Sequence, residues 1–451
     1  MNKMVNKLWT RIFIVAAAVL LLLFFSNDFG LIDIQETAIV VALGIDAAQE
    51  GEGYDVTAQI AVPASTGTSS AGNVTVKGVP TVGEAVAELN HETGWYPTLV
   101  HCRLILLGEE VANEDVFNVL DYFLRNDAVE DSCLVAACKG TARETFQAQS
   151  PIGDISASAI TKVLSSEAQA TGIVTVTILK NFAVGYYSES ESGFLPRISI
   201  KQEADSQGGQ NADGAFAPAG AFGKEKAPYT LSLAPSIKRN KWWRAKKRPL
   251  PIAAPVSAEG GNQGSGGQGG SGKSGSGSSA DVFHASETML FYKGKRVALL
   301  TPEETLAYNL AATDTDYAYG SVDVSENGEQ TSYNLKMKIS KKKRKLTFEN
   351  GMPVFTFTIR ANARIADTDK SHPIIDVAKT LLVNETILRA AEEKFQSELA
   401  SVWQKATNAG CDLFFLKEKL HRFHYKRYAD FKDSVPAAVQ VRYDIKFTSM
   451  K

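Results

Sequence analysis

A glycine-rich tract near the middle of the chain is the feature that most constrains the fold. Between Gly260 and Gly277 the 451-residue sequence has 10 glycines, interleaved with serine, glutamine and asparagine and without a large apolar side chain. Such a composition buries too little surface to offset the entropy of ordering the chain. We therefore predict that residues 201–281 form a flexible linker between two folded units, residues 33–200 and 282–451, each long enough to bury its own core.

The first unit alternates apolar strand patterns with amphipathic helix patterns. Helices are expected to begin at Thr81, where Glu84 completes a capping box, at Asn113 and near Thr141. The Ser/Thr/Gly-rich segment Ala64–Lys77 is typical of a loop. The strands are predicted at residues 39–45, 54–60, 104–107 and 133–138. This alternation indicates a domain built on a mixed sheet.

The second unit has the signals of hairpins and of one long helix. Lys293-Gly294-Lys295 predicts a tight turn, and Thr301 followed by Pro302 and Glu304 predicts a capped helix. Alternating strands are predicted at residues 333–339, 355–365 and 439–447, and a helix at Asn384–Asn408 that stops at Gly410. The expected fold class is therefore α+β: two mixed α/β units, an N-terminal mixed-sheet domain and a C-terminal antiparallel sheet with one long helix, joined by a flexible linker.

Residues 1–30 have the pattern of an export or anchoring segment. Lys3, Lys7 and Arg11 precede the unbroken apolar run Ile12–Phe25, which is the order of a secretory signal. Because no small-residue cleavage pattern follows Phe25, we favour an uncleaved signal or transmembrane anchor, with cleavage as the alternative. The flanking basic residues place the N-terminus in the cytoplasm and the bulk of the chain outside it.

The net charge of −2 hides an asymmetry between the two halves. Residues 33–200 carry 8 basic and 22 acidic side chains, a net of −14, whereas residues 201–281 and residues 282–451 each carry a net of +5. Our hypothesis is that the acidic half faces a basic surface, either the second half of this chain or a partner. Attraction of this kind weakens as salt is added.

Two basic clusters are candidate interaction sites. Lys341–Lys345, the run KKKRK, is most simply an exposed loop, with contact to an acidic surface as the alternative. The linker cluster combines cations with two tryptophans, a composition that favours anionic lipid headgroups, with a solvated loop as the alternative. Its residues are Lys238, Arg239, Lys241, Trp242, Trp243, Arg244, Lys246, Lys247 and Arg248. On an exported protein we expect no nucleic acid as partner.

No motif of the sequence predicts chemistry. Gly267–Ser274 fits the phosphate-binding pattern GxxxxGK[ST], but no strand precedes it and no helix follows, so its backbone cannot cradle a phosphate. His421 and His424 lack further ligands at the spacing of a zinc site, and His101 has no nucleophile motif beside it. The pairs Glu109-Glu110 and Glu303-Glu304 are expected at helix starts, where the helix dipole stabilises acidic side chains, so capping is a simpler role for them than acid–base catalysis. We predict no catalytic, cofactor-binding or metal-binding residues, and no enzyme.

Four cysteines are too few for a disulfide framework. Cys133 and Cys138, five residues apart in one strand, lie roughly 16 Å apart, which is beyond the ~7 Å limit of a disulfide. We expect these two, together with Cys102 and Cys411, to be small buried hydrophobic residues.

Several short motifs occur in the order found in one known family. They are Glu36 followed by Ala42-Leu-Gly-Ile-Asp46, Thr57–Pro63, His101–Ala112, Arg125-Asn-Asp127, Leu299-Leu300 with Thr301-Pro-Glu-Glu-Thr305, and Asp412-Leu-Phe-Phe-Leu416. In this order the chain resembles the Ger(x)C family of spore germination proteins over most of residues 33–200 and 282–451.

The resemblance implies a non-enzymatic third, C-type subunit of a germinant receptor. It would face outward on the spore inner membrane and assemble with two multi-span membrane subunits. Members of the family typically carry a lipid-modified cysteine after the signal segment. Here the first cysteine is Cys102, so the apolar N-terminal helix would be the anchor, and the linker at 201–281 is a second departure. The rival functions are a small-molecule sensing module and a cell-envelope enzyme.

Overall fold

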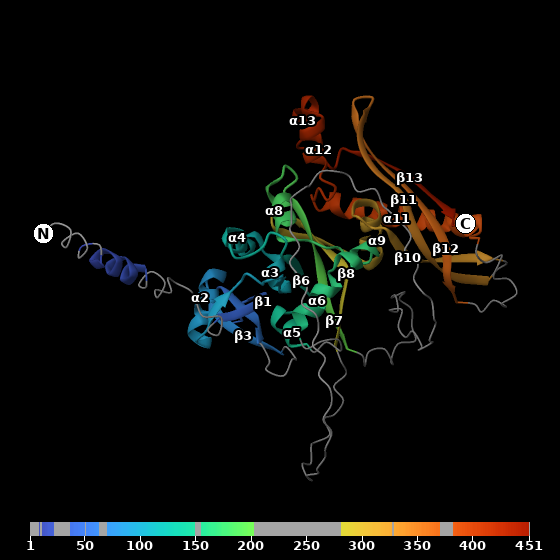
Figure 1. Ribbon diagram of the computed structural model, residues 1–451. Coiled ribbons are helices and arrows are strands. Elements are labelled where there is room, and N and C mark those ends of the chain that lie inside the picture. Colours follow the sequence, from blue (N-terminus) through green and yellow to red (C-terminus); the bar gives the residue numbers. More distant parts are fainter. Residues whose placement is uncertain are drawn as a thin grey trace, which may run out of the picture. The chain divides into compact units, whose positions relative to one another are not determined.

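Two β-sheets organise the chain (Figure 1). The computed structural model describes residue 9 and residues 11–21, 37–49, 51–62, 70–148, 155–202, 281–326, 329–369 and 382–450. The glycine-rich tract, the Gly267–Ser274 motif and the basic cluster at residues 238–248 lie outside the described residues, so the predictions made for them stay predictions.

The first sheet has nine strands in the order β3-β2-β1-β5-β6-β7-β8-β9, with β4 pairing to β1. Strands β1, β5, β6 and β7 are parallel to one another, whereas β2 and β3 on one side and β8 and β9 on the other are antiparallel. The strands are β1 (Thr37–Ala47), β2 (Tyr54–Val62), β3 (Ser70–Val79), β4 (Tyr96–Thr98), β5 (Leu104–Leu107), β6 (Leu134–Cys138), β7 (Ser192–Gln202), β8 (Asp281–Tyr292) and β9 (Lys295–Leu300). The predicted mixed sheet is confirmed.

Helices cover both faces of this sheet, which explains why β5 and β6 are apolar without alternation. One face packs against α2 (Val82–Thr93), α3 (Glu109–Asn113), α4 (Phe117–Arg125) and α8 (Leu179–Tyr187). The other face packs against α5 (Ala142–Gln147), α6 (Ser156–Val163) and α7 (Ser166–Ala170).

The sequence predicts that the second unit begins at residue 282. In the structure, β8 and β9, which lie after that point, instead extend the first sheet. Strand β8 pairs with β7 from Ser192 to Gln202, and the predicted turn at Lys293-Gly294 returns the chain as β9. The two turn residues have φ of 52° and 76°, which is the conformation that a two-residue hairpin requires. The first sheet is therefore completed by residues that follow the linker.

The second sheet has the order β10-β11-β12-β13 and packs on one long helix. Its elements are β10 (Tyr317–Glu326), β11 (Glu329–Glu349), β12 (Met352–Thr368) and β13 (Gln440–Ser449), with α9 (Pro302–Ala312), α11 (Glu385–Asn408), α12 (Leu416–Phe423) and α13 (Tyr425–Phe431). Strands β10, β11 and β12 are antiparallel, as expected, but β13 is parallel to β12. The expectation of a wholly antiparallel sheet is wrong because the helices between β12 and β13 form a crossover.

Most predicted helix starts are confirmed. The side chains of Thr81, Thr141 and Thr301 accept hydrogen bonds from backbone N–H groups three residues on, and Asn384 caps α11. Asn113 is instead the last residue of α3, and Oδ1 of Asp115 accepts the hydrogen bond from the N–H of Phe117 at the start of α4.

Two predicted loops contain strand. Residues 70–77 belong to β3, where short polar residues pair with β2. Lys341–Lys345 lies inside β11 rather than between strands. In both cases the segment is a strand because it pairs with a neighbouring strand, β2 for residues 70–77 and β10 and β12 for β11. A local sequence pattern does not reveal such pairing.

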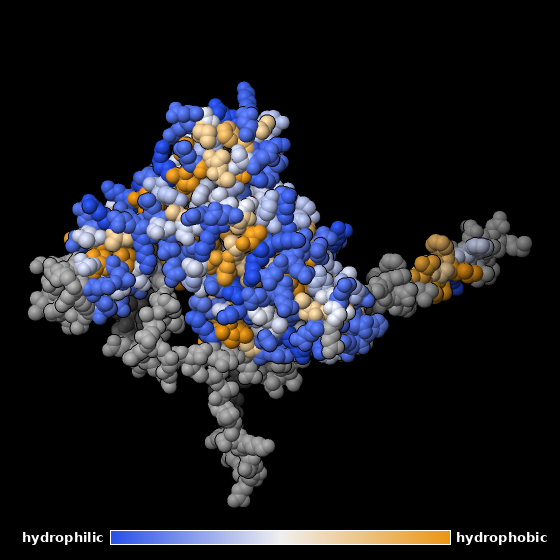
Figure 2. Space-filling model, turned by 180° about the vertical axis from the view of Figure 1, so that it is seen from behind, coloured by the Kyte–Doolittle hydropathy of each residue, from blue (hydrophilic) through white to orange (hydrophobic). Residues whose placement is uncertain are grey.

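Residues 11–21 are helical, and Figure 2 shows their surface as largely hydrophobic. No helix within the described ranges is long and apolar enough to cross a membrane. The predicted anchor continues through residues outside these ranges and stays a prediction.

Candidate functional site

Polar side chains gather where the parallel strands β1, β5 and β6 end. The buried carboxylate of Asp46 accepts hydrogen bonds from the N–H groups of Ala142 (2.7 Å) and Arg143 (3.0 Å) and so caps α5. Burial raises the pKa of Asp46, although these two hydrogen bonds act in the opposite direction. A Cβ atom at Gly108 would lie 2.2 Å from Oδ1 of Asp46. Only glycine at position 108 therefore leaves room for this carboxylate.

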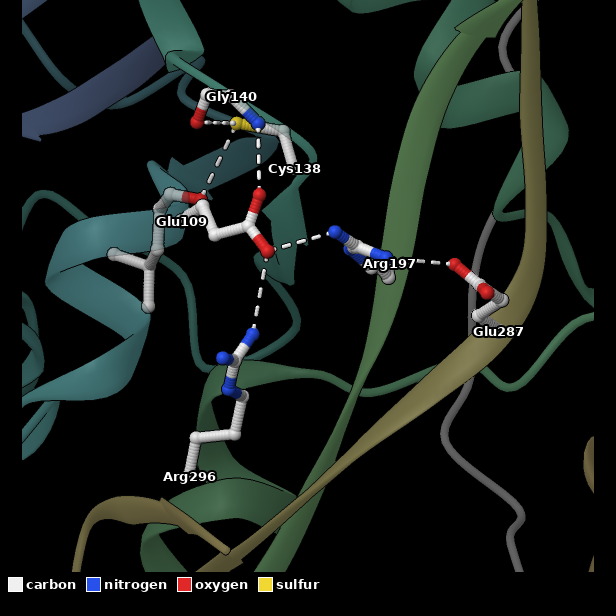
Figure 3. A network of polar contacts seen from close by, with 7 residues as sticks. Glu109, Cys138, Gly140, Arg197, Glu287 and Arg296 are labelled. Atoms are coloured by element: carbon white, nitrogen blue, oxygen red, sulfur yellow. Dashed lines mark hydrogen bonds and ion pairs between the residues drawn. The ribbon is translucent and has the colours of Figure 1, made fainter. Parts of the chain in front are cut away.

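The two carboxylate oxygens of Glu109 contact β7, β9 and the turn after β6 (Figure 3). Oε1 accepts from Arg197 of β7 (2.7 Å) and Arg296 of β9 (3.3 Å), and Oε2 accepts from the N–H of Gly140 after β6 (3.2 Å). Arg197 also donates to Glu287 of β8 at 3.0 Å. Burial opposes ionisation of Glu109, but the Gly140 N–H and the two guanidinium groups together lower its pKa. Glu109 begins α3 as predicted, and the structure adds the links to Arg197 and Arg296.

A second polar cluster joins Ser190 and Ser192 of the first half to Asp412 of the second. Oδ2 of Asp412 accepts a hydrogen bond of 2.6 Å from the hydroxyl of Ser190, and the N–H of Asp412 donates to Oγ of Ser192 at 2.9 Å. The Asp412 side chain also accepts from the N–H groups of Leu416 and Lys417, both at 2.8 Å, at the start of α12. Asp412 and both serines are buried. This cluster fixes α12 against the loop before β7.

Acids of the first half lie within 4.0 Å of basic side chains of the second in three cases, while Arg197 of the first half pairs with Glu287 of the second in the opposite sense. The three cases are Glu109–Arg296 (3.3 Å), Glu191–Lys293 (3.5 Å) and Glu189–His421 (4.0 Å). All six side chains are at least 28% exposed, and exposed pairs contribute little to stability. The hydrogen-bonded pairing of β7 with β8 is the stronger connection, and the hypothesis of an acidic half attracted to a basic surface stays a hypothesis.

Two surface pockets are lined by described residues. The larger, about 1020 Å³, is lined by apolar residues of β1, α6 and β8, including Val41 and Phe283, together with His101, Arg103, Lys162 and Glu167. The smaller, about 630 Å³, lies between α8 and α12 and is lined mainly by apolar groups such as Phe182 and Phe415. Sequence patterns gave no signal for either pocket, because each is formed by segments far apart in the chain.

The cysteines, histidines and paired glutamates singled out in the sequence lie in the following places. All four cysteines are buried and free, as expected, and burial raises the pKa of the Cys411 thiol to about 12. His421 lies in α12 and His424 directly after it. Glu304 closes the capping box of α9 and also binds Lys405 (2.7 Å) and Ser401 (2.6 Å) of α11. Within the described ranges no cluster of three His, Cys, Asp or Glu side chains has the arrangement of a metal site.

Comparison with protein families accounts for most of the folded chain. Residues 31–200 match the spore germination protein N-terminal domain, and residues 286–449 match the C-terminal domain described as spore germination B3/GerAC like. The chain belongs to the Ger(x)C family of spore germination proteins. Both clusters described above join residues of the two matched domains, Glu109 with Arg296 and Ser190 with Asp412.

The similarity of this Ger(x)C chain to individual relatives is lower or covers a smaller part of the chain than the two domain matches. Spore germination protein B3 of Bacillus subtilis (strain 168) is 31% identical over 127 residues, which are 26% of this chain and 33% of that protein. The match thus spans about a third of the length of that relative. A crystal structure of the GerBC protein is similar over 91% of this chain and 97% of its own, with a TM-score of 0.46 and 16% identity.

Proposed function

We propose that this chain is a membrane-anchored, extracytoplasmic subunit of a nutrient germinant receptor and acts in spore germination through protein–protein contacts, without catalysis. The observation that carries the proposal is the match of both Ger(x)C domains, in order, to residues 31–200 and 286–449. The polar clusters around Glu109 and Asp412 support it, because their side chains are occupied in holding strands and helices together.

The proposed location is the spore inner membrane, with residues 1–30 as a single-span anchor and the bulk of the chain outside the cytoplasm. The apolar surface of residues 11–21 supports an anchor (Figure 2). The proposed partners are two multi-span membrane subunits. The cluster Lys238–Arg248 would contact headgroups.

Deleting the gene tests this proposal. Spores of the deletion strain should lose optical density more slowly than wild-type spores when nutrients are added, while vegetative growth is unchanged. The strain must also lack paralogous receptors, since a second receptor would mask the defect. Germination at the wild-type rate in that background contradicts the proposal.

The larger pocket supports a second function, the sensing of a small molecule. The apolar Val41 and Phe283, with the basic side chains of Arg103 and Lys162 in the same lining, suit a ligand with an anionic group and an apolar part, and Glu167 is the one acid of the lining. Leucine or phenylalanine, used as probes, should then raise the melting temperature of the full chain, and Arg103→Ala should abolish the increase. An unchanged melting temperature of the wild-type chain with both probes would count against sensing at this pocket.

A further inference from the structure

One face of the second sheet is a basic surface. Because side chains alternate across a strand, apolar residues of β11, β12 and β13 pack against α11 and α12, while the opposite side of these strands is polar. The cations of the polar side, which we call the basic face, are Lys336, Lys338, Lys341, Lys343, Lys345, Arg360, Arg364, Arg442 and Lys446.

The strand register assembles these cations from three strands. Lys341 pairs with Arg360, and Arg360 pairs in turn with Lys446, so the three side chains form one row across the sheet. Lys336 pairs with Arg364 in a second row. An irregularity between Ile339 and Lys341 shifts the alternation, which brings Lys341, Lys343 and Lys345 to the basic face. A bulge commonly re-aims side chains in this way.

The KKKRK run is therefore divided between the two sides of the sheet. Lys342 and Arg344 pair with the core positions Ile359 and Phe357 and lie on the inner side. The ammonium group of Lys342 donates to the backbone carbonyls of Asn309 (3.4 Å) and Thr313. Lys341, Lys343 and Lys345 lie on the basic face, whereas Arg344 is exposed at a position that faces the inner side.

Most charges of the basic face lack a compensating acid. Asp444 binds Arg360 and Glu349 binds Arg442, while Asp323 and Asp367 lie toward the far end of the same side, on β10 and β12. The other seven cations have no carboxylate within ion-pair distance among the described residues: Lys336, Lys338, Lys341, Lys343, Lys345, Arg364 and Lys446. Six of these seven side chains are exposed, and Lys336 is half-buried.

The composition of the basic face favours a lipid surface over a protein partner. Six of its nine cations are lysines, the residue that is depleted in the centres of protein interfaces. Near an anionic membrane each lysine or arginine strengthens binding by roughly fivefold. The ammonium group of Lys336 lies 4.7 Å from the ring centre of Tyr317 and 5.3 Å from that of Tyr319, and aromatic side chains of this kind are frequent at headgroup level.

We propose that the basic face lies against an anionic lipid surface. This inference rests on the proposed membrane location and adds that the second sheet, and not only the N-terminus, contacts the membrane. The contact is electrostatic, since the face is formed by charged and other polar side chains rather than apolar ones that would insert into the bilayer.

A fluorescent label on the basic face tests the proposal in the full chain. All four native cysteines are buried, so a thiol label on Ser340→Cys, an exposed position between Lys338 and Lys341, is selective. The chain is reconstituted in bilayers of phosphatidylcholine with or without phosphatidylglycerol. Quenching by acrylamide, an uncharged quencher, should fall several-fold when phosphatidylglycerol is present and should recover in high salt.

Two controls separate lipid contact from a general charge effect. A label on Ser434→Cys, exposed but outside the basic face, should be quenched equally in both bilayers. The triple variant Lys341→Glu, Lys343→Glu and Lys345→Glu should lose the protection. The variant Lys139→Glu, Lys426→Glu and Lys432→Glu changes the net charge equally at exposed positions elsewhere and should keep it.

Equal quenching of the Ser340→Cys label in both bilayers overturns the proposal. Protection that requires an acidic polypeptide such as polyglutamate, and not phosphatidylglycerol, also overturns it and indicates a protein partner. Retention of the chain in pure phosphatidylcholine after a salt wash reports on the N-terminal anchor alone. A wrong prediction of the anchor would show as loss of the chain from phosphatidylcholine bilayers, whereas a wrong prediction of the lipid contact would show as unchanged quenching of the Ser340→Cys label.

Discussion

The hydroxyl of Ser190 donates a hydrogen bond of 2.6 Å to Asp412, although the two residues are 222 positions apart in the sequence. Both are buried, and they belong to the two different domains that match the Ger(x)C family. The bond lies at the start of α12, whose first N–H groups the same carboxylate accepts. The two domains are thus joined by a specific buried contact in addition to the pairing of β7 with β8.

Removing the carboxylate at this contact should destabilise the protein strongly. Asp412→Ala leaves two helix N–H groups and the Ser190 hydroxyl without their acceptor, and we expect a loss of about 2–4 kcal/mol in the free energy of unfolding. Ser190→Ala removes one donor and should cost about 1–2 kcal/mol. Chemical denaturation measures both, and Ser434→Ala, at an exposed hydroxyl, is the matched control. A cost for Asp412→Ala no larger than that of the control would contradict this account of the contact.

Gly108→Ala should displace the carboxylate that caps α5. The new methyl group would meet Oδ1 of Asp46 at 2.2 Å, so we expect a loss of about 2 kcal/mol or more from strain and the broken cap. Gly72→Ala is the control, because a Cβ there meets nothing within 4 Å. In the double variant Gly108→Ala/Asp46→Ala the clash is absent. Its loss of stability should therefore be smaller than the sum of the losses of the two single variants. Strict additivity in thermal or chemical unfolding would argue against the clash.

Protonation of Glu304 in acid should reduce the stability of the protein. Burial favours its neutral form, but hydrogen bonds from Lys405, Ser401 and the N–H of Thr301 lower its pKa below the ordinary value. A carboxylate with a lowered folded pKa stabilises the fold above its unfolded pKa, and this contribution is lost as the pH falls through the folded pKa. Unfolding measured from neutral to acid pH should therefore be less acid-sensitive in Glu304→Gln. At neutral pH this variant should be less stable by about 1–3 kcal/mol. An identical acid dependence in both proteins would refute the assignment.

Replacing Arg197 should reduce the stability of the protein more than replacing an exposed arginine. Its side chain is 11% exposed and binds both Glu109 and Glu287. Arg197→Ala removes the partner of Glu287 and leaves Glu109 with Arg296 and the N–H of Gly140, so we expect a cost of about 1–3 kcal/mol. Arg422→Ala breaks a pair within α12 whose arginine is 67% exposed, and should leave the stability unchanged within error. Equal stabilities of the two variants would mean that the Glu109 cluster contributes nothing to the fold.

Local patterns predicted the elements better than they predicted the pairing of strands. The caps at Thr81, Thr141, Thr301 and Asn384 follow from contacts within a few residues, and the sequence contains all the information for them. Strand direction is different, since the alternation of apolar residues in β13 is the same for a parallel and an antiparallel neighbour. The pairing of β8 with β7 across the linker is also invisible to local patterns.

The candidate site was predicted only in part for the same reason. Glu109 and Asp412 were noticed as members of short motifs, but their partners Arg197 and Ser190 lie in other segments. A single arginine inside the apolar strand β7 was the one local signal, because a charge there needs a partner. The sequence does not predict the basic face, because the local pattern of Lys341–Lys345 indicates a loop and the arginines of the face come from two other strands.

Co-purification from spore membranes tests whether this Ger(x)C chain assembles with two multi-span membrane subunits, as we propose. An affinity-tagged chain, solubilised in mild detergent from spore inner membranes and identified by mass spectrometry, should be recovered with two multi-span proteins. Recovery of the tagged chain alone, or in the soluble fraction without any membrane protein, would contradict the account.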